Sequence, residues 1–473
     1  MQSLKPAVFA LLACLLLVGC ATHHYRPAPI SAPETASNFE RRTLADPMLK
    51  QYLEKNLGHG IADWPIKTWD LGTLTLAAFY FNPSIEAARN HVATVEGSVV
   101  TAGARPNPTL SVSPGVPSPY LFGVDLSFQV ETAGKRGYRV QHAQNLSEAA
   151  RFELAEAAWK VRNGVRSALL AYLLPERSLG LLRSEEQIRE EQVKLLERRV
   201  AVGEIPRPDA DLARIELSKT RLSVRVAEGR LRQGRAELAA AIGVPDAALE
   251  GIEFYWPDLD SPPSAESLTP QRIQRDAVLN RLDVRRRLVE YAASEADLRL
   301  EIAKQYPDFT IGPGYQFEER NNFLTVVSAV TLPIFNRNQG PIAEAEGRRK
   351  EAASRFLITQ AQVIAESERA LAPYRAALEE LAEANDSLRK LQTVRERMTQ
   401  QAVRVGEADR LVLNGVLLES SVVATARLGA LGRAQVALGD LEDAVQRPLT
   451  GGDIVPLSPS SPALDAPGKE SKR

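Results

Sequence analysis

Two short segments of the chain alternate between apolar and polar residues. Between Phe122 and Val130 every second residue is apolar, and the residues in between are small or polar. A run over residues 322–332 has the same two-residue period, with serine and threonine among its apolar residues. This period places alternate side chains on the two faces of a β-strand. Since an extended segment and a polar turn precede each run, we predict two β-hairpins, with strands at about 108–131 and 307–333.

The first hairpin is predicted to have one apolar face and one polar face. This arrangement suits a strand between lipid and water, although half of a soluble sheet shows the same alternation. In a membrane strand of this kind, the polar side chains point into the lumen. The predicted lumen-facing residues are Asp125, Gln129 and Glu131. The aromatic residues expected near the outer membrane interface are Tyr120, Phe122, Tyr315, Phe317 and Phe323.

Helical periodicity covers most of the remaining chain. Apolar residues at seven-residue steps predict long helices that pack lengthwise on their neighbours, as at Leu217, Val224, Leu231 and Leu238. We expect Pro175 to kink or interrupt the first of the long helices. The predicted helices cover residues 71–104, 138–202, 208–242, 271–305, 341–405 and 409–445.

The two halves of the chain resemble each other. The segment PTLSVSPG at 108–115 aligns with PDFTIGPG at 307–314, and Val-Gly-Glu at 202–204 recurs at 405–407. This spacing of about 200 residues predicts an internal duplication, in which each copy holds a helix, a β-hairpin and a helical hairpin. The predicted divisions are a signal peptide at 1–19, a tether at 20–70, a first repeat at 71–250, a linker at 251–270, a second repeat at 271–448 and a disordered tail at 449–473.

The first residues read as a secretion signal. Residues 1–19 contain Lys5 and then an apolar run that ends in LLLVG, directly before Cys20. This run is too short for a membrane-spanning helix and predicts a signal peptide. The residues 17–20 resemble the bacterial lipobox, which predicts a lipid anchor with palmitate at Cys20. A chance cysteine after an ordinary signal peptide remains the alternative.

Composition and motifs exclude several functional classes. A formal net charge of -1 gives no basic surplus for binding nucleic acid. The five histidines are scattered, and no nucleotide-binding or zinc-hydrolase motif is present, so we predict neither an enzyme nor a cofactor. The adjacent His23 and His24 lack the spacing and the further ligands of a metal site. Cys14 and Cys20 are the only cysteines, so the mature chain is expected to have no internal disulfide.

Four strands are too few to close a barrel in a membrane. The smallest closed barrels need about eight strands. Three copies of a four-stranded chain supply twelve, an even number that closes without exposed edges. If the hairpins lie in a membrane, the chain is therefore expected to form a homotrimer.

With this order of hairpins and helices, residues 71–449 resemble the TolC-like outer-membrane efflux proteins. The resemblance implies a trimeric 12-stranded barrel in outer-membrane lipid and an α-helical barrel across the periplasm. The sorting position after Cys20 is not Asp, which by resemblance to other lipoproteins also favours the outer membrane. It also implies two partners, a periplasmic membrane-fusion adaptor and an inner-membrane pump of the resistance-nodulation-division class. Two strand-to-helix turns resemble the CzcC-like heavy-metal branch, and their residues are Gly134, Lys135, Arg136, Gly137, Asn336, Arg337, Asn338, Gln339 and Gly340.

The two Val-Gly-Glu segments lie where the helical hairpins of this family turn at the periplasmic end. Three copies of their acidic residues would form rings that attract cations and hold a closed aperture through bonds to Arg207 and Arg410. The alternative is that the glycines and aspartates only cap helices. The predicted tip or gate residues are Gly203, Glu204, Arg207, Asp209, Gly406, Glu407, Asp409 and Arg410.

Three functions remain open from the sequence. The first is a passive exit duct for heavy-metal cations, with metal choice made by the pump and adaptor. The second is the same duct with another cargo, either drugs and other organic solutes or a polypeptide of type I secretion. The third is a lipid-anchored coiled-coil scaffold without a pore, which would leave the two alternating hairpins unexplained.

Overall fold

The computed structural model of the protein describes residues 24–115, 121–266 and 268–449, together with Leu464. The chain divides into two compact units, Met1–Arg42 and Thr43–Arg473. In the first unit, α2 (Ala32–Glu40) is a helix without buried residues. The predicted signal peptide, Cys20, Tyr120 and nearly all of the predicted tail lie outside the described residues, so lipidation stays a prediction.

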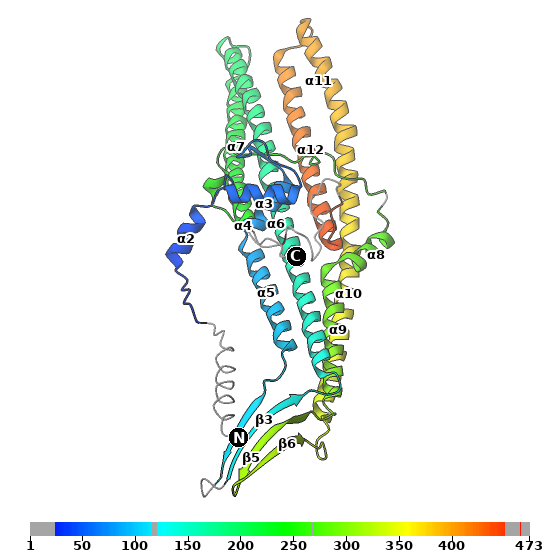
Figure 1. The fold of residues 1–473 in the computed structure, drawn as a ribbon. Coiled ribbons are helices and arrows are strands. Elements are labelled where there is room, and N and C mark those ends of the chain that lie inside the picture. The colour runs from blue at the N-terminus through cyan, green and yellow to red at the C-terminus, as the bar shows by residue number, and fades with distance from the viewer. Residues whose placement is uncertain (1–23, 116–120, 267, 450–463, 465–473) are drawn as a thin grey trace. The chain divides into compact units, whose positions relative to one another are not determined.

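Helices make up most of the second unit, as predicted (Figure 1). The helices of its first half are α3 (Pro47–Leu57), α4 (Leu71–Phe81), α5 (Pro83–Gly103), α6 (Lys135–Ala201) and α7 (Arg207–Ile242). Those of its second half are α8 (Pro270–Asn280), α9 (Leu282–Ala303), α10 (Gln339–Glu383), α11 (Arg389–Arg404) and α12 (Arg410–Val445). A π-helical turn (Ala384–Leu388) joins α10 to α11, and a 3-10 turn (Asp246–Leu249) follows α7. A mainly α fold with a small β part is thus confirmed.

Two of the predicted single helices are interrupted. The helix expected at 71–104 breaks at Asn82, because Pro83 disfavours helical backbone in the residue before it. Asn82 then caps α5 by accepting a hydrogen bond from the Ser84 backbone at 2.9 Å. The helix expected at 271–305 likewise breaks at Arg281. Pro175, in contrast, lies inside the continuous helix α6, so the alternative that it interrupts the helix was wrong.

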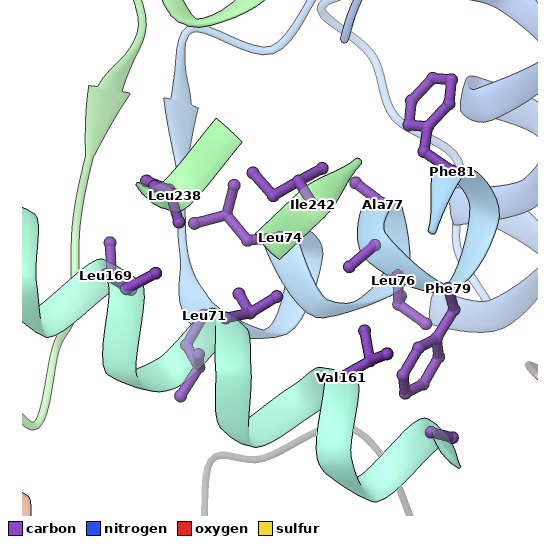
Figure 2. Close-up of a cluster of buried hydrophobic side chains, with 14 of the residues drawn as sticks. Leu71, Leu74, Leu76, Ala77, Phe79, Phe81, Val161, Leu169, Leu238 and Ile242 are labelled. Carbon is purple, nitrogen blue, oxygen red and sulfur yellow. The ribbon is translucent and has the colours of Figure 1, made fainter. Parts of the chain in front are cut away.

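A core cluster surrounds α4 (Figure 2). This helix is apolar on all sides, and a helix of that kind is stable only where other elements cover it. Its Leu74 and Phe79 are fully buried, together with Leu169 of α6 and Leu238 of α7. A short parallel pair, β1 (Thr68–Trp69) and β4 (Glu253–Phe254), lies beside this core.

Segments predicted as tether, linker and tail also contribute to this core. Leu49 and Leu53 of α3 are fully buried, although the sequence around them has no sustained period. Leu259 from the predicted linker and Leu464 from the predicted tail are buried in the same cluster. Isolated apolar residues in a Pro-rich segment carry no periodic signal, so only the folded chain reveals that they pack.

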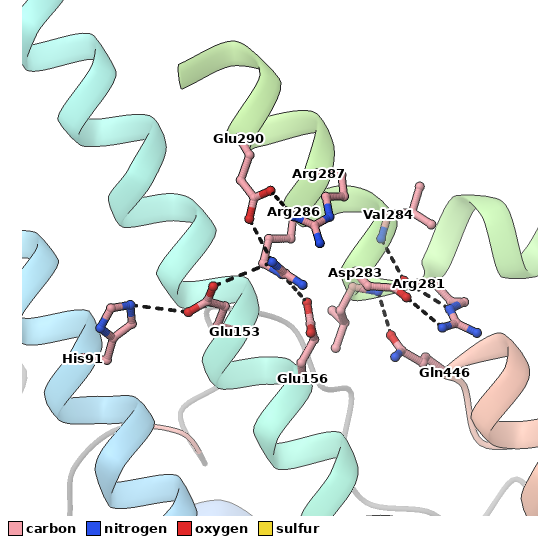
Figure 3. A network of polar contacts seen from close by, with 11 residues as sticks. His91, Glu153, Glu156, Arg281, Asp283, Val284, Arg286, Arg287, Glu290 and Gln446 are labelled. Carbon is pink, nitrogen blue, oxygen red and sulfur yellow. Dashed lines mark hydrogen bonds and ion pairs between the residues drawn. The ribbon is translucent and has the colours of Figure 1, made fainter. Parts of the chain in front are cut away.

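Ion pairs connect the two halves of the chain. Arg162 on α6 and Glu442 on α12 are buried and lie 3.1 Å apart, and Arg166 lies 3.5 Å from the same carboxylate. A second, more open network joins α5, α6 and α9 (Figure 3). There Arg286 of α9 bonds Glu156 of α6 at 2.8 Å. These contacts hold α6, from the first half of the chain, against α9 and α12 of the second half.

The four remaining strands form one antiparallel sheet at the opposite end of the long helices from the tips of the helical hairpins (Figure 1). In the order of the sheet they are β2 (Thr109–Pro114), β3 (Leu121–Val130), β5 (Phe309–Glu318) and β6 (Asn321–Val330). The two predicted hairpins thus pair with each other through β3 and β5. This leaves β2 and β6 as edge strands in the single chain.

Candidate functional site

The register of the sheet separates a polar face from an apolar face. Directly paired residues of antiparallel strands share a face. One cross-strand row joins Ser111, Asp125, Gly314 and Thr325, and another joins Gln129 to Thr310 and Ala329. The rows on the other face are mostly apolar, and one of them joins Val112, Val124, Tyr315 and Leu324. All four strands therefore contribute to the same two-faced surface.

The apolar face is open to the surroundings in a single chain. Leu324 is 92% exposed and Val326 is 74% exposed. The predicted aromatic residues Phe122 and Phe317 are paired on this face near the hairpin turns. Phe323, however, pairs with Gln316 on the polar face, so its assignment to the membrane interface was wrong.

Two of the predicted lumen-facing residues lie within β3, and the third does not. Asp125 and Gln129 are on the polar face, as the register shows. Glu131 follows the end of β3 and forms a two-fold ion pair with Arg139, whose nitrogens lie 2.7 and 3.2 Å from its carboxylate oxygens. Glu131 therefore helps to fix the strand-to-helix turn.

The first strand-to-helix turn forms hydrogen bonds with the segment that connects α9 to β5. Gly134 adopts a left-handed conformation, with a φ of 74°, and α6 starts directly after it. The Lys135 ammonium, only 8% exposed, donates to the Tyr306 carbonyl and to Asp308, both at 2.6 Å. Thr132 also donates to Asp308 through its backbone, at 2.8 Å. The turn after β3 is thus held to the segment that enters β5.

The Asp308 contacts predict a pH dependence. Partial burial alone would raise the pKa of this carboxyl, but the hydrogen bonds from Lys135 and Thr132 outweigh it and hold the pKa below its usual range. A lowered pKa stabilises the fold above the unfolded value of about 3.9, and this contribution is lost as the pH falls through the folded pKa. We expect Asp308→Asn to lower the unfolding temperature near pH 7, and to lower it by less near pH 3, below the unfolded pKa of about 3.9. An equal difference at both pH values would contradict this role.

Arginines of the same turn cap the end of α5. Arg136 donates to the Gly103 carbonyl at 2.7 Å, and Arg139 donates to the Ala102 carbonyl at 2.7 Å. Carbonyls at a helix C-terminus lack intrahelical partners, and cations stabilise them. A side chain at Gly137 would meet no atom within 4 Å, so packing around this residue does not require glycine.

The second strand-to-helix turn binds α9. Asn338 has a φ of 63°, and its amide donates to the Glu301 carbonyl and carboxylate, both at 2.8 Å. Its backbone N–H donates to Asn336, and the N–H of Arg337 donates to Gln339, both at 2.8 Å. The next residue, Gly340, meets no close atoms. The second turn therefore contacts the last turn of α9, and the first contacts the segment that follows it.

The two helical tips have the same backbone conformation. Gly203 and Gly406 have φ values of 74° and 81°, which favour glycine. After each glycine, the N–H of Glu204 or Glu407 donates back to a carbonyl five residues earlier, at 2.8 Å. This is the hydrogen-bond pattern of a Schellman cap, so the predicted cap role of both glycines is confirmed.

The acidic residues of the tips have separate roles within one chain. Asp409 caps α12 by accepting from the Leu411 backbone at 3.3 Å, and Asp209 lies in the first turn of α7, where a negative charge is favourable. Glu204 lies 3.6 Å from Arg199. The Glu407 side chain is exposed, and it forms no hydrogen bond or ion pair within the described part of the chain.

An arginine that the sequence reading did not single out connects the two tips. Arg199 of α6 bonds Asp409, and Arg410 bonds Glu191 of α6 at 2.8 Å. The guanidinium of Arg199 and the backbone of Leu411 hold the pKa of Asp409 below its usual range. Arg207 pairs with Asp211 instead, at 3.8 Å. No sequence signal identifies Arg199, because it is one of many charged residues on a solvated helix.

Nothing in the described part of the chain resembles a metal centre. No group of three or more His, Cys, Asp or Glu side chains is arranged there to hold an ion.

Sequence and structural comparisons relate the chain to outer-membrane proteins. The model of the family "Outer membrane efflux protein" matches residues 78–244. The cobalt-zinc-cadmium resistance protein CzcC of Cupriavidus metallidurans is 28% identical over 280 residues, which span 58% of this chain and 66% of CzcC, just under two thirds of that relative. The pyoverdine export outer membrane protein OpmQ of Pseudomonas aeruginosa is 22% identical over 69% of this chain and 72% of its own length.

The fold also matches a solved structure. The outer membrane protein VceC of Vibrio cholerae superposes with a TM-score of 0.62, at 19% identity, over 80% of this chain and 97% of VceC. At that identity the likeness concerns the fold alone. The sequence matches thus relate residues 78–244 to the outer membrane efflux protein family, and the chain shares its fold with VceC.

Proposed function

We propose that this chain is the outer-membrane exit duct of a tripartite resistance-nodulation-division efflux system that exports heavy-metal cations. In this proposal the duct is passive, and an inner-membrane pump and a periplasmic adaptor supply energy and selection. The similarity to the cobalt-zinc-cadmium resistance protein supports heavy-metal cations as the cargo. The predicted absence of a tight metal site is compatible with it, since a duct need not bind what it passes.

The two-faced sheet is the observation that carries the proposal. A face that holds Asp125, Gln129 and Thr310 suits water, and a face that exposes Leu324 and Val326 suits lipid. In a soluble protein, an apolar face of this extent would need another layer of protein to cover it.

The proposed homotrimer follows from the strand edges. Strands β2 and β6 have no outer partner in the described chain, and unpaired strand edges are not stable in lipid. Three chains that pair these edges would close a barrel of twelve strands. Neighbouring chains would then cover the exposed valines along α12, namely Val412, Val422 and Val436. An internal duplication would explain why each half supplies one strand hairpin and one helical tip.

Two neighbouring residues of β3 test the assignment of the faces. We expect Asp125→Leu to reduce cation preference and conductance in planar bilayers while the protein still inserts. Val124→Asp, one residue away on the apolar face, is expected to impair insertion, because a charge that faces lipid is destabilising, by about 2–4 kcal/mol for Arg or Lys at mid-membrane and by less for Asp. Recovery from the outer-membrane fraction and single-channel conductance would be measured for both. Equal behaviour of the two variants would contradict the proposed faces.

We further propose that the periplasmic tips act as a gate. In each chain, Arg199 holds Asp409 and Glu204, and these contacts would favour the closed arrangement. Exposed ion pairs contribute little individually, so Arg199→Gln should increase the open fraction by about 1.5- to 5-fold for each lost pair. Added salt should reduce the difference from the wild type.

Arg198→Gln provides the control for the gate. Arg198 precedes Arg199 on the same helix but donates only to its own helix, at the Lys194 carbonyl. Its removal changes the net charge equally without touching the contact between the tips. If both variants conduct alike, the acidic residues of the tips cap helices and do not gate.

Export of an organic solute is the second candidate, and the similarity to the pyoverdine export protein favours it. Metal-sensitivity and pyoverdine-export assays of a deletion strain, complemented with this chain, would separate the two cargoes. A scaffold without a pore is disfavoured by the exposed apolar face of the sheet. A lipid at Cys20 remains part of the proposal, and mass spectrometry of the mature N-terminus would test it.

A further inference from the structure

A pocket of about 500 Å³ lies where α11 and α12 meet α6, away from both the sheet and the helical tips. Small-molecule sites commonly have volumes of about 300–1,000 Å³. Part of its wall is apolar and consists of Leu181 from α6 and of Val423 and Leu428 from α12. The pocket therefore has the size and the apolar surface to hold a small organic group.

The charged residues that line this pocket are all arginines. Arg177, Arg389 and Arg427 contribute to it, and none of its described lining residues is acidic. One nearby carboxylate, Asp260, is shared by two of them, at 2.9 Å from Arg177 and 3.5 Å from Arg427. For Arg389, the described residues offer no carboxylate partner and no other side-chain hydrogen bond. The pocket thus has an uncompensated positive charge.

The π-helical turn next to the pocket orients one of these arginines. A π turn adds a residue to the helix and often occurs at functional sites. Asn385, within this turn, accepts a hydrogen bond from Nε of Arg427 at 2.6 Å. Nη1 of Arg427, and Nε and Nη2 of Arg177, have no acceptor within the described chain, so they are available to a ligand.

We propose that this pocket binds a small organic anion, a carboxylate or a phosphate ester with a compact apolar group. A guanidinium binds such anions through two parallel hydrogen bonds, and Arg389 provides this fork. The apolar part of the ligand packs on Leu181, Val423 and Leu428. The proposal for this pocket does not depend on the proposed export of cations.

Phenyl phosphate serves as the probe, in calorimetric titrations of the purified full-length protein at low ionic strength. We expect saturable binding, with a Kd of about 0.1–1 mM for a ligand of this size. Inorganic phosphate, which lacks the apolar group, should bind several-fold more weakly. Arg389→Gln should weaken phenyl phosphate binding by about tenfold or more, because a hydrogen bond to a charged group is lost.

Arg397→Gln is the matched control, since Arg397 is exposed on the same helix and does not line the pocket. Its Kd should stay within about twofold of the wild type. Val423→Asn should weaken phenyl phosphate binding and leave that of inorganic phosphate unchanged. Equal effects of the two arginine variants would overturn the proposal. A changed oligomeric mass for Arg389→Gln would also overturn it, by showing that this face is a contact between subunits.

Discussion

Replacing Glu442 by Ala is expected to lower the free energy of unfolding by about 3–5 kcal/mol. The Glu442 side chain is only 1% exposed, and it faces the guanidinium groups of Arg162 and Arg166 inside the protein. Its carboxylate also accepts from the Leu449 backbone at 2.8 Å. The substitution removes the carboxylate charge that faces the two buried guanidinium groups. The resulting loss in free energy of unfolding is far larger than that for one exposed ion pair.

Thermal or denaturant unfolding of the purified protein measures this effect. The control is Glu380→Ala, because Glu380 forms a comparable pair with Arg433 at the surface, where the two side chains are 49% and 57% exposed. Exposed pairs contribute about 0–1 kcal/mol. If both variants lose similar stability, burial of the Glu442 cluster does not determine its contribution.

Replacing Gly312 by Ala is expected to prevent formation of the native sheet. A Cβ atom at this position would lie 1.8 Å from the carbonyl oxygen of Leu126 on the neighbouring strand. The clash involves backbone on both sides, so no side-chain rotation relieves it. We expect a loss of more than about 4 kcal/mol, a size seen only for severe disruptions. Recovery of folded protein in the outer-membrane fraction provides the measurement.

Gly123→Ala is the matched control, because both glycines lie on the polar face of the same sheet. The nearest atom to a Cβ at Gly123 is 3.6 Å away, which is an ordinary contact. Normal recovery of Gly123→Ala with loss of Gly312→Ala would attribute the defect to the close approach of the strands. Normal recovery of both would show that the strands separate easily at Gly312.

The pairing of β3 with β5 is interrupted next to Gly312, and the sequence of β5 gives a reason. Proline at position 313 has no N–H, and the pairing of β3 with β5 skips Leu126 and Ser127. Proline is rare within central strands. The corresponding Pro114 ends β2 at the edge of the sheet. The alignment of the two segments predicts both prolines as strand residues, but it does not indicate that one of them is central.

Local signals predicted the elements well. The two-residue period placed the strands of both hairpins, and Gly203 and Gly406 have the left-handed backbone expected of helix ends. Of the heptad residues on α7, Leu217, Val224 and Leu238 are buried. One error of boundary arose where a residue before proline ended a helix, at Asn82, and another arose at Arg281, which no proline follows.

The sequence by itself thus determined the strand hairpins, the long helices and the caps of the tips, because each depends on residues close together in the chain. Only the tertiary structure decided which residues meet across the two halves. Arg162 and Glu442 are 280 residues apart, and Arg199 and Asp409 are 210 apart. The pairing of β3 with β5 also placed Phe323 on the polar face. Such contacts depend on how helices and strands pack, and a solvated arginine or an isolated apolar residue gives no local signal of its partner.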